Sequence, residues 1–200
     1  MLGILLLVAT VSTWGLPVTG YTVGCVPRRL CVDKDALQEL AQSVAHNISS
    51  SHDRRILLKM KQFRKITRWP KLHGCVMIRV ADFYDHVLRR KLGMTENDHV
   101  GDRRGPFVDL MGLMQHLDDC VRVDEMKCQG LNAKAEKMPL IETPPVKKMQ
   151  PREWAILQIQ QLNQAMKNIS DAETLSKAID ELKVLHNYIK GSGVRNWSKE

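Results

Sequence analysis

The stretch HGCVMIRVADFYDHVLRR, residues 73–90, decides the fold class of this chain. Apolar residues recur in it every three or four positions between charged ones, which is the spacing of one face of an α-helix. A glycine follows shortly after, where a helix end is expected. The pattern predicts an amphipathic helix over residues 78–92, with Cys75 at its start and with Phe83 and Tyr84 buried in a core.

Other parts of the chain repeat this helical period, and no stretch shows the alternation with a period of two that a half-buried strand requires. The further predicted helices cover residues 33–48, 107–121, 152–169 and 172–190. The segment 54–66 is a helix candidate too, although it is short and strongly charged. The connection 138–151 holds four of the eight prolines and should be exposed and non-helical. The sequence therefore predicts an all-α bundle of five to seven helices.

The N-terminus predicts export from the cell. An unbroken apolar run extends from Leu2 to Val11 without a charged side chain, and it is shorter than the roughly 20 residues that span a bilayer. We therefore expect a signal peptide at residues 1–20 and a single helical domain at 21–200, secreted and without membrane insertion. Three Asn-x-Ser sequons agree with this route and predict glycosylation. Their asparagines are Asn47, Asn168 and Asn196.

The positive charge is concentrated in one segment. Residues 53–72 contain eight Lys or Arg and one acid, so this segment alone carries a net +7 while the whole chain carries +8. Such a run is either a solvated face or a surface for heparan sulfate and other polyanions, and the sequence leaves both open. The candidate polyanion-binding residues are Lys61, Arg64, Lys65, Arg68 and Lys71. A secreted cationic polyanion-binding or antimicrobial protein is thus one functional alternative.

The cysteines and histidines favour disulfides over metal binding or catalysis. In an oxidising compartment the five cysteines should form two disulfides and leave one over. The close Cys-x2-Cys or His-x3-His pairs of a zinc site are absent from the sequence, and no motif ties a histidine to a nucleophile or to paired carboxylates. We expect no metal, no cofactor and no enzymatic activity, with His86, His116 and His186 solvated or capping.

Two motifs resemble the interleukin-10 family of class II helical cytokines. CVMIRVADFYDHVL, residues 75–88, is similar to the family's helix C, in which a cysteine precedes a Phe-Tyr pair by about two turns. KAIDELKVLHNYIK, residues 177–190, is similar to the family's last helix, where Lys-Ala, a nearby Glu and then an aliphatic and aromatic face recur. These are the more specific of the motifs that carry the resemblance.

Further similarities favour the interleukin-19, -20 and -24 subgroup, with interleukin-22, interleukin-26 and interleukin-10 as alternatives. RRLCVDKDALQELAQSV at residues 28–44, followed by RRILLKM at 54–60, looks like the subgroup's helix A and AB loop. The interval from Cys120 to Cys128 resembles its cysteine cluster after helix D, although the subgroup usually has one more cysteine there and another beside Cys75. Together the similarities cover most of residues 28–190.

The resemblance implies a bundle of six to seven helices stapled by disulfides. Its cysteine pattern implies bridges from Cys31 to Cys120 and from Cys75 to Cys128. It gives Cys25 no obvious counterpart, and Cys25 is an alternative to Cys31 as the partner of Cys120. It also leaves the oligomeric state open. Short connections favour a monomer, while the long one at residues 138–151 would allow helix exchange, as in the intertwined dimers of interleukin-10.

The resemblance also implies a function. It implies a secreted cytokine that binds a heterodimeric class II cytokine receptor and activates JAK-STAT signalling in immune and epithelial responses. The family places its high-affinity receptor on helix A, the AB loop and the last helix. The receptor-binding residues that this implies here, all expected to be exposed, are Arg54, Arg55, Asp180 and Lys183.

Overall fold

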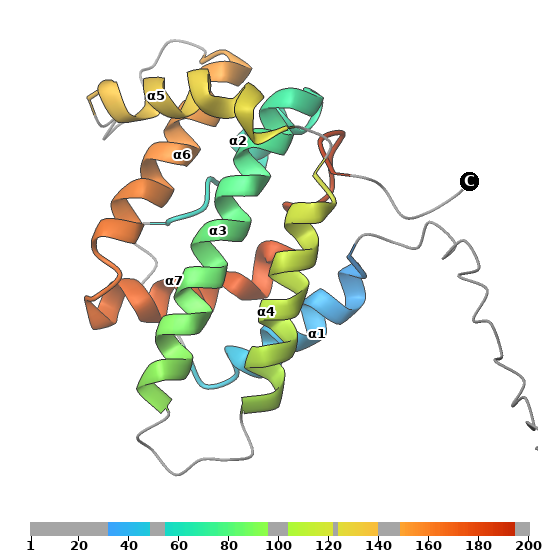
Figure 1. The fold of residues 1–200 in the computed structure, drawn as a ribbon, viewed down its shortest axis with the longest axis vertical. Helices are drawn as coiled ribbons and strands as arrows, with labels where there is room; N and C mark the ends of the chain where they lie inside the picture. The colour runs from blue at the N-terminus through green and yellow to red at the C-terminus, as the bar shows by residue number, and fades with distance from the viewer. Residues whose placement is uncertain (1–31, 49–54, 96–103, 122–123, 140–148, 195–200) are drawn as a thin grey trace, which may run out of the picture.

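The computed structural model describes residues 32–48, 55–95, 104–121, 124–139 and 149–194 (Figure 1). Within these ranges the chain forms seven α-helices, a short 3-10 helix η2 and no β-strand. The helices are α1 Lys34–Val44, α2 Met60–Thr67, α3 Pro70–Thr95, α4 Arg104–Asp119, η2 Glu125–Cys128, α5 Gln129–Lys137, α6 Pro151–Lys167 and α7 Ala172–Leu185. The prediction of an all-α fold is confirmed. The predicted signal peptide, Cys25, Cys31, Arg54 and Asn196 lie outside the described residues.

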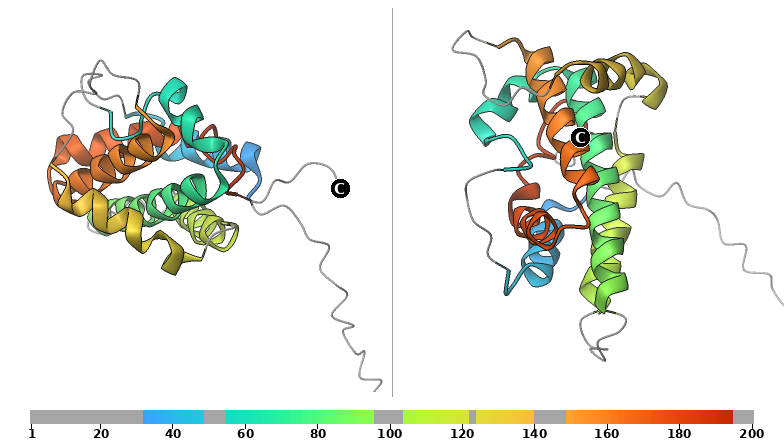
Figure 2. Two further views of the ribbon diagram at one scale, coloured as in Figure 1. Left: turned by 90° about the horizontal axis from the view of Figure 1, so that it is seen from above. Right: turned by 90° about the vertical axis from the view of Figure 1, so that its left-hand side faces the viewer.

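Helix α3 forms the axis of the bundle and contacts α2, α4, α6, α7 and η2. Figure 2 shows α4 running alongside α3, while α1 and α7 cross the face of this pair. At 26 residues α3 is longer than predicted, because it begins at Pro70, where a proline suits the first helical turn, and runs past Gly93. Cys75 therefore lies in the second turn of the helix instead of at its start.

The core is one continuous cluster of apolar side chains drawn from all seven α-helices. Phe83 and Tyr84 are 1% and 0% exposed, and their rings meet edge to face with centroids 5.1 Å apart, so the predicted inward orientation is confirmed. Helix α6 passes through this core with all of residues 155–160 buried. A helix buried on every side needs a partner for each polar residue it carries, which applies here to Gln158 and Gln160.

Side-chain caps explain where several helices begin. The Asp33 carboxylate accepts the N–H groups of Asp35 at 2.8 Å and Ala36 at 3.3 Å, which fixes the start of α1. Asp171 accepts the Thr174 N–H at 2.8 Å at the start of α7, and these hydrogen bonds to Thr174 lower the pKa of the Asp171 carboxyl. The caps fix the boundaries that hydrophobic periodicity alone leaves vague.

Some predicted helix boundaries are wrong, and two elements are not predicted. The segment 54–66 becomes helical only at Met60, because residues 56–58 are buried in a non-helical connection. The last helix ends at Leu185, and residues up to 190 form turns. Neither η2 nor α5 is predicted, since α5 buries only Leu131 and Ala135 and so has almost no apolar periodicity.

Candidate functional site

Residues 55–58, which we call the pinned segment, are the described end of the connection from α1 to α2, and they lie beside α6 and α7. The segment is the teal stretch that passes beside α6 in Figure 1. Arg55 is exposed, whereas Ile56, Leu57 and Leu58 are buried. Buried backbone outside a helix or sheet must find hydrogen-bond partners elsewhere. The identity of those partners determines how rigid the segment is.

Two side chains of the last helices satisfy most of this backbone. Glu181 of α7 accepts the Ile56 N–H at 2.9 Å through Oε1 and the Leu57 N–H at 2.8 Å through Oε2. Gln158 of α6 accepts the Leu58 N–H at 2.8 Å and donates its amide to the Ile56 carbonyl at 2.9 Å. The pinned segment is therefore fixed by residues that lie a hundred or more positions further along the chain.

Tyr188 completes the set by donating its hydroxyl to the Leu58 carbonyl. Burial raises the pKa of this phenol to about 12, so it remains a donor at any physiological pH. Sequence reasoning misses Gln158, Glu181 and Tyr188 as anchors. The one available signal is Gln158, a polar residue inside the apolar run of α6, which would have to be hydrogen-bonded if that run is buried.

The Glu181 carboxylate interacts with the positive charges around the pinned segment as well as with its backbone. Burial raises the pKa of its carboxyl, and this effect exceeds the opposing influence of the two backbone hydrogen bonds and of the positive charges on Lys177 and Arg55. Arg55 is thus exposed to solvent and also interacts with the carboxylate that anchors its own segment. Arg55 is therefore an exposed cation on a backbone segment that hydrogen bonds hold in place.

Asp180 and Lys183 are half-buried, so the expectation that they are exposed is wrong. The Lys183 ammonium donates to Asp180 Oδ1 at 2.8 Å and to the Ile48 carbonyl at 2.7 Å, and the two side chains are 34% and 19% exposed. Helices α1 and α7 pack together, and Lys183 reaches the backbone that follows α1. The pair therefore ties the end of the α1 region to α7, next to the pinned segment.

A second candidate surface is the outer face of α2 and the start of α3, which we call the basic face. All five predicted polyanion-binding residues are exposed on it, namely Lys61, Arg64, Lys65, Arg68 and Lys71. The opposite side of α2 buries Phe63 and Ile66 completely. Trp69 lies among the cations and is 56% exposed. In the part of the chain that the structure describes, none of these cations forms an ion pair with a carboxylate.

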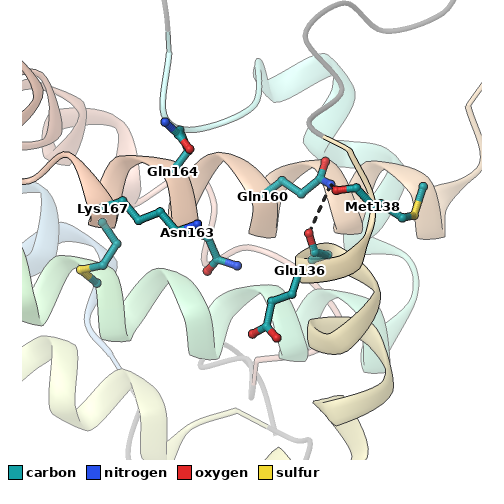
Figure 3. Close-up of a pocket in the computed structure, with 8 residues that line it drawn as sticks. Glu136, Met138, Gln160, Asn163, Gln164 and Lys167 are labelled. Atoms are coloured by element: carbon teal, nitrogen blue, oxygen red, sulfur yellow. Dashed lines mark hydrogen bonds between the residues drawn. The ribbon is translucent and has the colours of Figure 1, made fainter.

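A hollow of about 550 Å³ lies between α5 and α6, and Figure 3 shows its lining. The Gln160 amide donates to the carbonyls of Ala135, Met138 and Pro139 at 3.1–3.3 Å, so it closes the C-terminal end of α5. Glu136 and Lys167 also line the hollow. No set of three or more His, Cys, Asp or Glu residues in the described ranges could hold a metal ion. The polar contacts in the hollow serve mainly to hold the end of α5 against α6.

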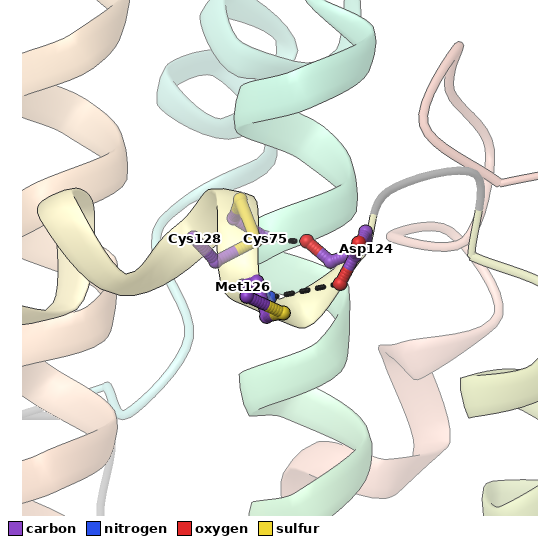
Figure 4. The surroundings of a disulfide bond; sticks show 4 residues. All are labelled: Cys75, Asp124, Met126 and Cys128. Carbon is purple, nitrogen blue, oxygen red and sulfur yellow. Dashed lines mark hydrogen bonds between the residues drawn. A yellow bond between two sulfur atoms is a disulfide. The ribbon is translucent and has the colours of Figure 1, made fainter.

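The predicted disulfide between Cys75 and Cys128 is present, with an Sγ–Sγ distance of 2.02 Å and a Cα–Cα distance of 5.4 Å (Figure 4). It joins the second turn of α3 to the end of η2, whose first turn is capped by a hydrogen bond from the Met126 N–H to Asp124. Cys120 is buried, with Sγ 2.9 Å from the His116 carbonyl oxygen. Its expected partner, Cys31, lies outside the described residues.

The remaining predicted residues are on the surface. Asn47 and Asn168 are exposed, after α1 and at the C-cap of α6 respectively, so both asparagines are accessible. His86 and His116 are exposed, and His186 caps the end of α7, where its Nδ1 lies 3.1 Å from the Lys183 carbonyl oxygen. No helix in the described ranges has the length and apolarity to cross a membrane.

Comparison of the chain with protein-family models, with curated proteins and with solved structures gives no match.

Proposed function

We propose that this protein is a secreted cytokine of the interleukin-10 family, most similar to the interleukin-19, -20 and -24 subgroup, that binds a heterodimeric class II cytokine receptor and activates JAK-STAT signalling. The observation that carries the proposal is the pinned segment. It holds Arg55 at the surface on a connection whose backbone is anchored to α6 and α7. The Cys75–Cys128 disulfide agrees with the cysteine pattern that the resemblance implies.

A rigid connection favours binding because little conformational entropy is lost when the partner docks. Arginine is also one of the residue types that most often dominate binding energy at protein interfaces. In this proposal Arg55 and the neighbouring Arg54 contact the receptor directly. Asp180 and Lys183 support the same surface by holding the backbone at Ile48.

The test is a panel of class II cytokine receptor ectodomains, probed with the purified protein and with an Arg55→Ala variant. We expect one receptor pair to retain the wild type and the variant to bind at least about tenfold more weakly, as for a residue that dominates an interface. Lys134→Ala is the matched control, because it removes one exposed positive charge from α5, which packs against α6 and η2. If no class II ectodomain retains the wild type, the proposal is wrong.

A second candidate function is favoured by the basic face. Five exposed cations around an exposed Trp69 form a surface suited to a sulfated polysaccharide, since cations displace counterions from the polymer and an indole stacks on apolar sugar faces. The protein would then bind heparan sulfate or another polyanion, alone or in addition to a receptor.

Replacement of Arg64, Lys65 and Arg68 by Gln tests this second function. The salt concentration needed to elute the variant from heparin should fall, and receptor-driven STAT activation should be unchanged, because the pinned segment is untouched. Replacement of Lys134, Lys137 and Lys167 by Gln is the control, since it removes the same charge from exposed positions on α5 and α6. Equal losses in the two variants would show that only net charge matters and would exclude a specific basic face.

A further inference from the structure

His73 is completely buried in the first turns of α3, beneath residues 188–194, which we call the C-terminal turn. In Figure 1 this turn is the dark red segment that follows α7 and reaches the junction of α2 and α3. The imidazole is hydrogen-bonded through both ring nitrogens. Its Nε2 lies 2.9 Å from the Tyr188 carbonyl oxygen, and its Nδ1 lies 3.0 Å from the Gly193 amide nitrogen.

These two contacts determine the protonation state of the ring. A carbonyl oxygen can only accept, so Nε2 must carry the proton and donate to Tyr188. A backbone N–H can only donate, so Nδ1 must be unprotonated to accept from Gly193. The closed turn therefore requires the neutral Nε2–H tautomer. A second proton on Nδ1 would face the Gly193 N–H and remove that hydrogen bond.

The C-terminal turn has no space to accommodate a displaced ring. A Cβ atom added at Gly191 would overlap the His73 imidazole, and one added at Gly193 would overlap the backbone of Gly74 and Pro70. The turn is also attached by Ser192, whose N–H and hydroxyl both donate to the Thr67 carbonyl, at 2.9 Å and 2.7 Å. Loss of the Gly193 hydrogen bond would therefore strain a close-packed contact.

No carboxylate faces His73 to stabilise a positive charge within the described part of the chain. Phe63 of α2 meets the ring edge to face with centroids 5.7 Å apart, and Tyr188 directs its phenol to Leu58. From α3 and the C-terminal turn the ring meets backbone and glycine. Burial is the larger influence and lowers the pKa of the imidazole, while the hydrogen bond to Tyr188 opposes it. The nearby cations Arg68, Lys71 and Lys190 are exposed.

We propose that His73 makes the C-terminal turn an acid-operated latch, closed on α2 and α3 while the imidazole is neutral and released when it becomes protonated. The inference does not depend on the proposed receptor function. Once the turn has opened, the imidazole is hydrated and titrates near the ordinary histidine pKa of about 6.5. Protonation at pH 5.0 then favours the open state by up to about 30-fold over its population at neutral pH.

Amide hydrogen exchange of the full secreted chain, with its disulfides intact, measures this opening directly. After correction for intrinsic rates, the protection of Ser192, Gly193 and Val194 should fall by up to about 30-fold between pH 7.5 and pH 5.0. The buried α6 amides at 155–159 should stay more protected than the turn at both pH values, because they exchange only through global unfolding, which costs more free energy than opening of the turn. Equal protection of the turn and of α6 at both pH values would mean that the turn opens only in global unfolding, and no loss at Ser192 to Val194 would mean no latch. Either result overturns the proposal.

A His73→Asn variant tests whether the imidazole is the sensor. The asparagine amide places an oxygen close to the position of Nδ1, so it can accept from Gly193 at any pH without titrating. Protection in the C-terminal turn should then be independent of pH. His86→Asn is the matched control, because His86 is an exposed histidine on the same helix. In this control, protection of the C-terminal turn should depend on pH as it does in the wild type. Wild-type pH dependence in His73→Asn would overturn the proposal.

A measurement on the unmodified protein covers the case in which His73→Asn does not fold. The ¹⁵N chemical shifts of the His73 ring report which nitrogen carries the proton. We expect the Nε2–H tautomer at pH 7.5. As the pH falls, Nδ1 should become protonated, and the Gly193 amide should lose its protection from exchange over the same pH range. A ring that is protonated on Nδ1 at pH 7.5, or that titrates while Gly193 stays protected, would contradict the latch.

Discussion

The pinned segment and the C-terminal turn are both irregular backbone held by distant side chains, but the groups that hold them respond to acid in opposite directions. The pinned segment presents two consecutive N–H donors, and a carboxylate with two acceptor oxygens matches them. The C-terminal turn presents one carbonyl and one N–H, and a neutral imidazole with one donor and one acceptor matches those. The backbone groups to be satisfied thus determine which ionisable residue is suitable.

The first and largest prediction breaks the pinned segment. Glu181→Ala should lower the free energy of unfolding by about 2 to 5 kcal/mol, because two N–H groups lose their acceptors at once. Chemical denaturation measures this loss. Glu181→Gln keeps one acceptor oxygen, so its free energy of unfolding should lie between those of Glu181→Ala and the wild type. Glu136→Ala, at an exposed position on α5, should change stability by less than about 0.5 kcal/mol.

The second prediction breaks the C-terminal turn without touching an ionisable group. Gly193→Ala should cost about 1 to 3 kcal/mol, since its Cβ would overlap backbone atoms of Gly74 and Pro70 that cannot move aside independently. Gly112→Ala is the control in thermal unfolding. Its Cβ meets nothing within 4 Å in the middle of α4, so this variant should be stabilised by about 0.5 to 1 kcal/mol. Equal effects of the two substitutions would contradict the close packing of the turn.

The third prediction uses pH to separate the two regions. The pKa of the His73 imidazole is lowered by burial, so the unfolded chain binds this proton more readily and stability falls as the pH drops below about 6.5. The pKa of the Glu181 carboxyl is raised by burial, so its contribution to stability grows as the pH falls toward the ordinary glutamate value. Relative to the wild type, the loss of stability from pH 7.5 to 5.0 should be smaller in His73→Asn and larger in Glu181→Gln.

Each proton changes the stability by at most about 1.4 kcal/mol per pH unit, so denaturant titrations at four or five pH values resolve the difference. His186 has a pKa lowered mainly by burial and contributes in the same direction as His73, so the His73→Asn profile should be flatter but not flat. Parallel profiles for the three proteins would contradict the opposite roles of the two regions.

The fourth and smallest prediction sharpens the role of Lys183. Lys183→Ala should cost about 1 kcal/mol in unfolding, because its charge-assisted hydrogen bonds to the Ile48 carbonyl and to Asp180 are lost from a half-buried position. If Lys183 only supports the surface, receptor affinity should fall less than in Arg55→Ala. A larger loss of affinity than in Arg55→Ala would make Lys183 a direct contact. Binding and denaturation measured on the same preparation distinguish the two.

Local features of the sequence predict the helices, whereas the anchors depend on contacts that no local pattern contains. The period of three or four and the cap at Asp33 involve neighbours along the chain, so they are visible in the sequence. Glu181 and Tyr188 bond backbone more than a hundred residues away, and both also fit an ordinary helix surface or core. Helix α5 is missed because packing on α6 and the disulfide support it instead of its own amphipathicity.

The Cys75–Cys128 disulfide and the basic face are predictable from the sequence for different reasons. Charge density is a property of composition, so a cationic surface at residues 61–71 follows once α2 buries its apolar side. The pairing of Cys75 with Cys128 came from a resemblance in cysteine pattern, and composition alone would have left several pairings open. His73 carried no signal as a single residue, since its role depends on the turn that covers it.

The contact of Gly193 with Gly74 also provides a way to recognise relatives of this chain. A side chain at Gly193 would overlap the Gly74 backbone, and one at Gly191 would overlap the His73 imidazole, so the two glycines and the His-Gly pair that they pack against should persist together in any descendant of the same ancestor. The expected signature is His-Gly-x at the head of a long helix together with Gly-x-Gly after the last helix. Such a pair of short motifs, separated by more than a hundred residues, would identify a common origin where the surrounding sequence has diverged beyond detection.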